Sequence, residues 1–169
     1  MTTKSLLKTV LKRNSKNFYL NNNNKHKTFD IFLSYHVKDQ VEVIKLHREL
    51  SKYYNVWLDL VEIKIGDDLN ERISQSIQNS NLFICCLNNE YLDSPNCRYE
   101  LMKAQKEDKS IYILPFEKLL YINEDHLVSE YDIKNENIYE LNNEISIDKD
   151  ITSILEFIFG INIKANHVS

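Results

Sequence analysis

The chain has 169 residues, a formal net charge of −4 and 43% hydrophobic residues, which is enough for one domain with a hydrophobic core. Only two glycines are present, so neither a P-loop nor a Gly-rich dinucleotide loop can be built, and any nucleotide must be held by other means. No apolar run approaches the length of a membrane span. The three cysteines lack CxxC spacing and give no support to a zinc site.

Charge is distributed unevenly along the chain. Residues 1–28 carry seven of the 21 Lys and Arg residues and none of the 25 acids, so a basic arm precedes an acidic body. Residues 4–13 separate leucines and lysines onto two faces of a helix, which suits weak contact with an anionic membrane surface, a partner groove or a transit segment. A solvated tail is the alternative. We therefore divide the chain into an arm and linker, residues 1–28, and a domain, residues 29–165.

Strand-like and helix-like segments alternate after the arm, as they do in a parallel α/β domain. Periodicity predicts helices over residues 38–54, around Ile73, from Ser94 onward, within 117–135 and over 149–159. Apolar runs predict strands at Phe29–Ser34, Asn55–Leu58, Asn81–Leu87 and Ser110–Phe116, with a candidate fifth at Ile138–Leu141. This order implies a flavodoxin-like, doubly wound α/β sheet of about five parallel strands flanked by helices, with ligands outside the carboxyl ends of the strands.

Several side chains are assigned to the core. Asn81–Leu87 is apolar on both faces, so it should be a central strand covered on both sides. Cys85 and Cys86 point to its opposite faces, and we interpret them as free thiols in a reducing compartment, the cytoplasm. The other positions predicted to face inward are Val43, Ile44, His47, Leu50, Tyr54, Trp57, Leu69, Ile73 and Ile77.

The segment after the third strand contains a well-defined helix start. Ser94 can accept hydrogen bonds from the free N–H groups of the first turn, and Pro95 suits the next position, where its missing N–H is not needed. Cys97 and Leu101 then lie on an inward stripe, with Glu100 beside them. A carboxylate at the edge of a buried face is unfavourable unless something compensates, so this position suggests either an ion pair or a site.

Three sequence motifs lie at the expected ligand edge. FDIFLSYH spans residues 29–36, VWLDL spans 56–60 with Gly66 seven residues after Asp59, and SPNCRYEL spans 94–101. Together they resemble the TIR (Toll/interleukin-1 receptor) domain over about residues 29–116. SPNCRYEL is similar to the S-x-W-C-x-x-E-L segment of plant-type and other NAD-cleaving TIR domains.

The resemblance implies one of two activities. Some TIR domains only recruit other TIR domains, whereas others hydrolyse or cyclise NAD+ and release nicotinamide, with the helix glutamate essential. Glu100 falls on that glutamate, so the expected substrate is NAD+ and no cofactor or metal is implied. Nicotinamide leaves as a neutral molecule, so no general acid is needed. One carboxylate that stabilises the developing oxocarbenium charge can be enough.

The same resemblance assigns further residues. The first loop of the family contacts the nucleotide, so Tyr35 and His36 are expected to bind substrate, with ordinary exposed loop residues as the alternative. Histidine in place of the commoner arginine makes phosphate attraction pH-dependent. Ser34 is expected either to hydrogen-bond to the substrate or to satisfy backbone groups at the end of the strand. Asp59 and Cys97 complete the expected pocket, although Cys97 also fits a small core residue. The BB loop, which in the family contacts a neighbouring TIR domain and can close over its active site, contains Glu62, Lys64 and Gly66, and Gly66 also fits a position of positive φ.

One position departs from the family pattern. The tryptophan four residues before the glutamate, which can stack on the substrate's base, is Asn96 in this chain. Loss of a stacking ring weakens binding by roughly 1–3 kcal/mol unless Tyr35 or Tyr99 compensates. Asn96 is still expected to line the substrate site.

The leading hypothesis is an intracellular NAD+ nucleosidase in TIR-based signalling or defence, giving ADP-ribose or a cyclic ADP-ribose and acting as a homo-oligomer. The runner-up is a non-catalytic TIR adaptor, in which Glu100 forms an ordinary ion pair, for example with Lys103. A phospho-receiver domain shares the architecture, but Leu87-Asn88 and Ser34-Tyr35 do not supply its aspartates. No nucleic-acid partner is expected.

Overall fold

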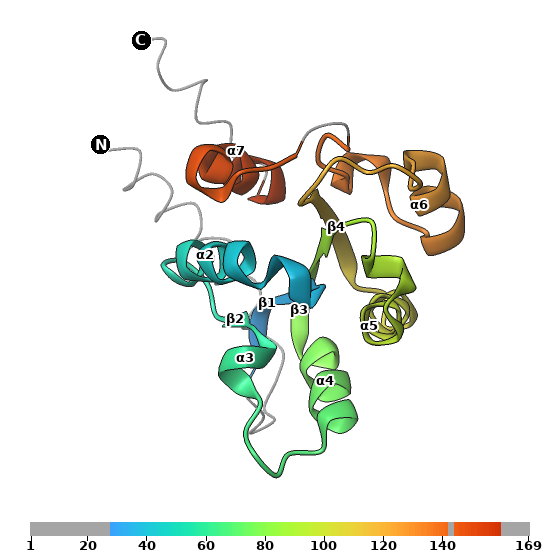
Figure 1. The fold of residues 1–169 in the computed structure, drawn as a ribbon. Helices are drawn as coiled ribbons and strands as arrows, with labels where there is room; N and C mark the ends of the chain where they lie inside the picture. The colour runs from blue at the N-terminus through green and yellow to red at the C-terminus, as the bar shows by residue number, and fades with distance from the viewer. Residues whose placement is uncertain (1–27, 142–143, 160–169) are drawn as a thin grey trace.

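A computed structural model describes residues 28–141 and 144–159. Almost all of the predicted arm, including residues 4–13, lies outside these ranges, as do the last positions predicted for the domain, 160–165. Figure 1 shows a sheet with helices on both sides. The predicted α/β class is therefore confirmed.

Four parallel strands form the sheet: β1 (Phe29–Tyr35), β2 (Val56–Trp57), β3 (Ser80–Leu87) and β4 (Ser110–Pro115). Their order in space is β2-β1-β3-β4. The chain winds outward in both directions from the β1/β3 pair, which makes this pair the topological switch point of a flavodoxin-like sheet. The four strands predicted before residue 117 are all present, within one or two residues of their expected bounds.

The predicted fifth strand is wrong. Ile138 makes one parallel bridge to Ile113 of β4, and Tyr139 N donates to Ile113 O at 3.0 Å, but within the described residues the sheet has four strands. The extended run cannot continue because Glu140 has a φ of 23°. The residues just before it form a short 3-10 helix, η4 (Asn135–Asn137).

Helices cover both faces of the sheet (Figure 1). One face carries α2 (Gln40–Ser51) and α7 (Ile147–Phe159), and the other carries α4 (Leu69–Gln78), α5 (Pro95–Lys106) and α6 (Glu124–Tyr131). Three short elements lie in the loops: η2 (Val37–Asp39), α3 (Asp59–Glu62) and η3 (Tyr91–Asp93). The turn α3 was predicted as loop, and the first predicted helix ends at Ser51 rather than at residue 54.

Two predicted core positions are exposed. The buried stripe of α2 is Val43, Leu46 and Leu50, so Ile44, one residue and about 100° round the helix from Val43, faces solvent. Leu69 is exposed because it is the first residue of α4, directly after the capping residue Asp68, before the helix reaches the sheet.

Alternation along β1 assigns its side chains to the two layers. Ile31 and Leu33 pack under α2 and α7, whereas Phe32 packs under α4 and α5. Phe32 also stacks between Trp57 and Phe83, with ring centroids 4.3 and 5.4 Å away, so Trp57 is a core residue as predicted. By the same period of two, Ser34 faces the α5 layer. This alternation is the reason why a serine of β1 can meet a residue of α5.

Candidate active site around Glu100

The helix that carries Glu100 begins where the sequence predicts. Ser94 is the N-cap of α5 and its Oγ accepts from Cys97 N at 3.4 Å, with Pro95 at the first helical position. Cys97 and Leu101 are buried against the sheet, as their spacing indicates. Glu100 is partly buried beside them and reaches the carboxyl end of β1.

A serine of the sheet holds the Glu100 carboxylate. Ser34 Oγ donates to Glu100 Oε2, and the same Oγ lies 2.6 Å from the hydroxyl of Tyr91. Ser34 is 1% exposed and Tyr91 is 0% exposed, so neither hydroxyl has access to solvent. Ser34 was among the predicted site residues, whereas Tyr91 was not. The available signal was a tyrosine three residues before the Ser94 cap, in a loop that follows a fully buried strand.

The environment of Glu100 favours its neutral form. Burial raises the pKa of Glu100 from 4.5 to about 8, the hydrogen bond from Ser34 acts in the opposite direction, and the negative charge of Asp59 adds to the rise. At neutral pH the carboxyl is therefore mostly protonated, with a minor ionised fraction. A carboxyl with a pKa near the working pH is typical of functional sites.

The ion pair expected under the adaptor hypothesis is not formed. Lys103 Nζ lies 2.6 Å from Glu107 Oε1, one turn further along α5, and donates to it. Within residues 28–141 and 144–159, no cation lies within ion-pair distance of Glu100. A structural salt bridge therefore does not account for a carboxylate at this position.

Tyr35 and Asp59 join the loops that follow β1 and β2. The Tyr35 hydroxyl donates to Asp59 Oδ1 at 2.8 Å, and Leu60 N donates to the same oxygen at 2.7 Å. Cys97 Sγ donates to the Tyr35 carbonyl at 3.3 Å. Burial raises the pKa of the Cys97 thiol to about 11, so Cys97 is a small packing residue and not a thiolate nucleophile.

His36 lies next to these residues but is turned toward its own loop. Its Nδ1 accepts from Lys38 N at 3.2 Å, which leaves Nε2 as the protonated nitrogen of the neutral ring. The Lys38 ammonium lies 2.9 Å from Glu90 and 3.9 Å from Glu117. Two carboxylates thus compete with any phosphate for Lys38.

Asn96, at the tryptophan position of the family motif, is exposed one turn before Glu100 on the same side of α5. Tyr99 is also exposed, and the Tyr35 hydroxyl is bonded to Asp59.

These contacts bring most of the predicted site residues into one connected cluster: Ser34, Tyr35, Asp59, Cys97 and Glu100. Asn96 lies at the rim of this cluster.

The predicted BB loop is α3 followed by a tight turn. Lys64 N donates to Asp67 Oδ2 at 2.9 Å and Asp67 N donates to Lys64 O at 3.1 Å, which closes a turn with Gly66 at φ +96°. The positive φ predicted for Gly66 is confirmed. Glu62 ends α3, where its carbonyl accepts from Arg72 at 3.2 Å. The exposed apolar residues of this segment are Leu60, Val61 and Ile65, and Leu69 at the start of α4 is exposed just beyond it.

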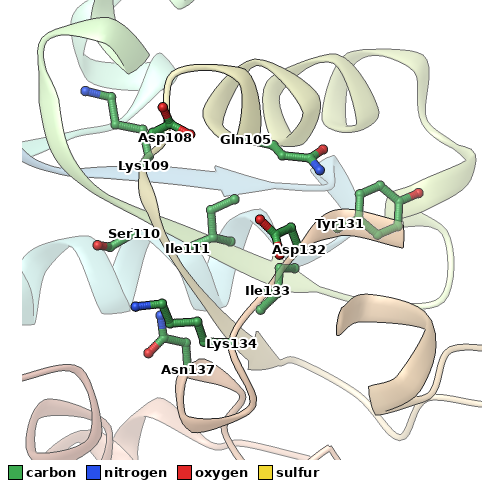
Figure 2. A pocket seen from close by; sticks show the side chains of 10 residues that line it. All are labelled: Gln105, Asp108, Lys109, Ser110, Ile111, Tyr131, Asp132, Ile133, Lys134 and Asn137. Carbon is green, nitrogen blue, oxygen red and sulfur yellow. The ribbon is translucent and has the colours of Figure 1, made fainter. Parts of the chain in front are cut away.

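A hollow of about 210 Å³ lies at the other edge of the sheet (Figure 2). Its walls include Ser110 and Ile111, at the start of β4, and Tyr131 and Asp132, at the end of α6. Strands begin at this edge, whereas Ser34 lies where β1 ends, so the hollow contains none of the predicted site residues. It is not the candidate active site.

Two features are absent from the part of the chain that the structure describes. It contains no group of three or more His, Cys, Asp or Glu side chains placed to hold a metal ion. Nor does it contain a helix with the length and apolar character needed to cross a membrane.

Comparison with known families identifies the class of protein. A family model described as "TIR domain" matches residues 31–133, more than half of the chain. This chain therefore belongs to the TIR domain family, as its three loop motifs indicate.

Two curated relatives are each similar to about half of this chain. The chain is 33% identical over 91 residues to "Probable 2' cyclic ADP-D-ribose synthase TcpO" from Methanobrevibacter olleyae, covering 50% of this chain and 27% of the relative. It is 29% identical over 93 residues to "2' cyclic ADP-D-ribose synthase BtTIR" from Bacteroides thetaiotaomicron, covering 53% of this chain and 32% of the relative. The matches thus span less than a third of each relative's length.

Solved structures agree on the fold. The TIR domain of the Toll-related receptor TRR-2 from Hydra magnipapillata has a TM-score of 0.56 at 17% identity, covering 76% of this chain and 92% of that domain. The TIR domains of the activated Roq1 resistosome, which recognises the pathogen effector XopQ, have a TM-score of 0.50 at 18% identity, covering 83% and 90%.

Proposed function

We propose that this chain is an NAD+ nucleosidase that cleaves the bond between nicotinamide and ribose, with Glu100 as the catalytic carboxylate. The observation that carries the proposal is the position of Glu100: partly buried at the carboxyl edge of the β1/β3 switch point, held by Ser34 and without a described cation partner. The names of the two curated relatives support the same chemistry.

The reaction needs little from the protein beyond charge and position. The C1′–N1 bond breaks with its electron pair going to the ring nitrogen, so nicotinamide leaves neutral and the ribose acquires oxocarbenium character. Ionised Glu100 stabilises that positive charge, and the effect is large because the carboxylate is preorganised in a buried position. Attack by water gives ADP-ribose, whereas attack by one of the substrate's own hydroxyls gives a cyclic product. Either route releases one proton.

The remaining residues of the cluster are assigned to the substrate pocket, where each either positions its neighbours or lies where the substrate would bind. Ser34 orients the carboxylate, Tyr35 and Asp59 fix the neighbouring loops, and His36 and Asn96 lie near the rim, where an adenine or phosphate would pass. Cys97 packs beneath them. The domain that carries this activity is residues 29–165, and the three reduced cysteines favour the cytoplasm.

Assembly is the second candidate function. The exposed apolar residues of the BB loop favour contact with another TIR domain, since such patches mark interaction sites. We place Glu62, Lys64 and Gly66 at this contact. A non-catalytic adaptor would use the same surface, and the exposed Asn96 in place of a stacking ring favours that reading.

Nicotinamide release separates the two candidates. The whole chain is incubated with NAD+ at high protein concentration, beside Glu100→Ala, and nicotinamide is measured by chromatography. The enzyme hypothesis requires release by the wild type and loss of release in the variant. Mass spectrometry distinguishes the products, because the cyclic form lacks one water relative to ADP-ribose.

The adaptor hypothesis makes a different prediction. Neither protein releases nicotinamide, whereas the wild type self-associates and Ile65→Asp, at the exposed tip of the loop, does not. Sedimentation measures self-association directly. Equal release by the wild type and Glu100→Ala would remove the catalytic assignment.

A further inference from the structure

Tyr91 is a buried tyrosine that the proposed chemistry does not use. It lies in η3, in the loop between β3 and α5, and is 0% exposed. Its hydroxyl lies 2.6 Å from Ser34 Oγ, across 57 residues of sequence. A buried phenol needs a hydrogen-bond partner, and the partner in this case is the serine that holds Glu100.

The direction of the hydrogen bonds follows from a proton count. Ser34 has one hydroxyl proton and donates it to Glu100 Oε2. The bond between Ser34 and Tyr91 must therefore use the Tyr91 proton, with Ser34 Oγ as the acceptor. Burial raises the pKa of Tyr91 well above its ordinary value, so Tyr91 keeps its proton over the whole neutral range.

The geometry points to Tyr91 as a positioning residue: by donating to Ser34, it directs the single serine proton toward Glu100 and stabilises the ionised carboxylate. In a chain of hydrogen bonds each donor strengthens the next, so the phenol acts on a carboxylate that it does not itself contact. Any effect of Tyr91 on the rate of nicotinamide release rests on the proposed function. The effect of Tyr91 on the ionisation of Glu100 does not depend on that proposal.

The other titratable groups around Glu100 do not stabilise its ionised form. The titratable groups that act on Glu100, or on which it acts, are Tyr35 of β1, Asp59 of α3, Cys85 of β3, Tyr91 of η3 and Cys97 of α5. Burial raises the pKa of Tyr35, Cys85 and Cys97, which leaves them neutral, and Asp59 is negative. None of these groups is a cation, so the hydrogen bond from Ser34, supported by Tyr91, is the interaction that favours the ionised form of Glu100.

Direct titration of Glu100 tests the inference without any substrate. The full chain is labelled with ¹³C at the glutamate carboxyl carbons, and the Glu100 signal is assigned by its loss in Glu100→Gln. The midpoint is then measured in the wild type, Tyr91→Phe, Ser34→Ala and the double variant. Tyr112→Phe, a tyrosine on β4 packed in the other layer, serves as the control for loss of a phenol hydroxyl.

The expected wild-type midpoint is about 8. Tyr91→Phe raises it by roughly half a unit, and Ser34→Ala raises it by roughly one unit or more, because a hydrogen bond to an ionised group is lost. Adding Tyr91→Phe to Ser34→Ala produces no further rise, since the phenol acts through the serine. If nicotinamide is released, the acid limb of kcat/KM moves by the same amounts while KM changes little.

Two results would overturn the inference. One is an unchanged midpoint in Tyr91→Phe, and the other is an equal shift in the presence and absence of Ser34. If Tyr91→Phe does not fold, 3-fluorotyrosine at position 91 provides the test, because a more acidic phenol is a stronger donor and must lower the midpoint. Absence of nicotinamide release would remove the proposed enzyme and leave these titration results standing.

Discussion

Ser34 donates a hydrogen bond to Glu100 across 66 residues of sequence. The contact joins β1 to α5 at the carboxyl edge of the sheet, where strands wind outward in two directions from β1 and β3. Parallel α/β sheets bind ligands at such a point. The bond therefore links the position of the site in the fold to the ionisation of its central carboxyl.

The pH dependence of the reaction follows from the Glu100 pKa. Burial holds that pKa at about 8, and the proposed chemistry needs the ionised form. We expect kcat/KM for nicotinamide release to rise with pH and to level off above a midpoint near 8. A rate that is flat between pH 5 and 9 would show that ionisation of Glu100 does not limit the reaction.

Asp59→Asn tests the charge that lies near Glu100. The asparagine keeps an oxygen for the Tyr35 hydroxyl and removes a negative charge that raises the Glu100 pKa. The midpoint of kcat/KM should fall, by less than roughly one unit because burial is the larger cause. Glu62→Gln, on the same helical turn, is the matched control and should leave the midpoint unchanged. A higher midpoint in Asp59→Asn would contradict the conclusion that the Asp59 charge raises the Glu100 pKa.

Glu100→Gln should stabilise the folded chain, with an effect that depends on pH. Between about pH 4.5 and 8 the unfolded chain ionises Glu100 while the folded chain keeps the proton, so the wild type loses stability as pH rises. A glutamine at this position does not titrate, so the variant does not lose stability in this way. The free energy of unfolding of Glu100→Gln should therefore exceed that of the wild type by an amount that grows by up to about 1.4 kcal/mol per pH unit across that window. Urea unfolding at pH 5, 6.5 and 8 measures it, and a constant difference would contradict the pKa shift.

Asn96→Trp restores the ring found in the family motif. The position is exposed one turn before Glu100, so an indole can be accommodated without displacing core residues. Stacking on a base contributes roughly 1–3 kcal/mol, which lowers KM for NAD+ roughly five-fold to a hundredfold with a smaller effect on kcat. Asn96→Ala is the control. An unchanged KM would mean that the base does not lie against this position.

Local chemistry made much of the fold predictable. The Ser94 cap with Pro95 after it located the start of α5, and the unbroken apolar run of β3 identified a central strand. The opposite orientations of Cys85 and Cys86 followed from strand geometry and were confirmed. These features depend on neighbours in sequence, so the sequence contains the information directly.

The features that were predicted wrongly or not predicted depend on tertiary packing rather than on neighbours in sequence. Ile138–Leu141 has the composition of a strand, but Glu140 takes a left-handed conformation that no local pattern indicates. Ile44 satisfies a helical spacing, yet the direction in which α2 meets the sheet decides which side is buried. Tyr91 contacts Ser34, 57 positions away in sequence, through a hydroxyl whose partner depends on tertiary packing. The sequence placed Glu100 at an edge, but its neutralising environment came from packing between β1, η3 and α5.

The proposed function requires the Glu100 carboxylate to perform the reaction. The most direct measurement is the rate of nicotinamide release from NAD+ by the wild type, Glu100→Gln and Glu107→Gln, since Glu107 is a carboxylate near the end of the same helix that pairs with Lys103. We predict that Glu100→Gln, which keeps the size of the side chain, loses release by a factor of roughly a hundred or more. Glu107→Gln should retain the wild-type rate. Release by Glu100→Gln at the wild-type rate would contradict the account.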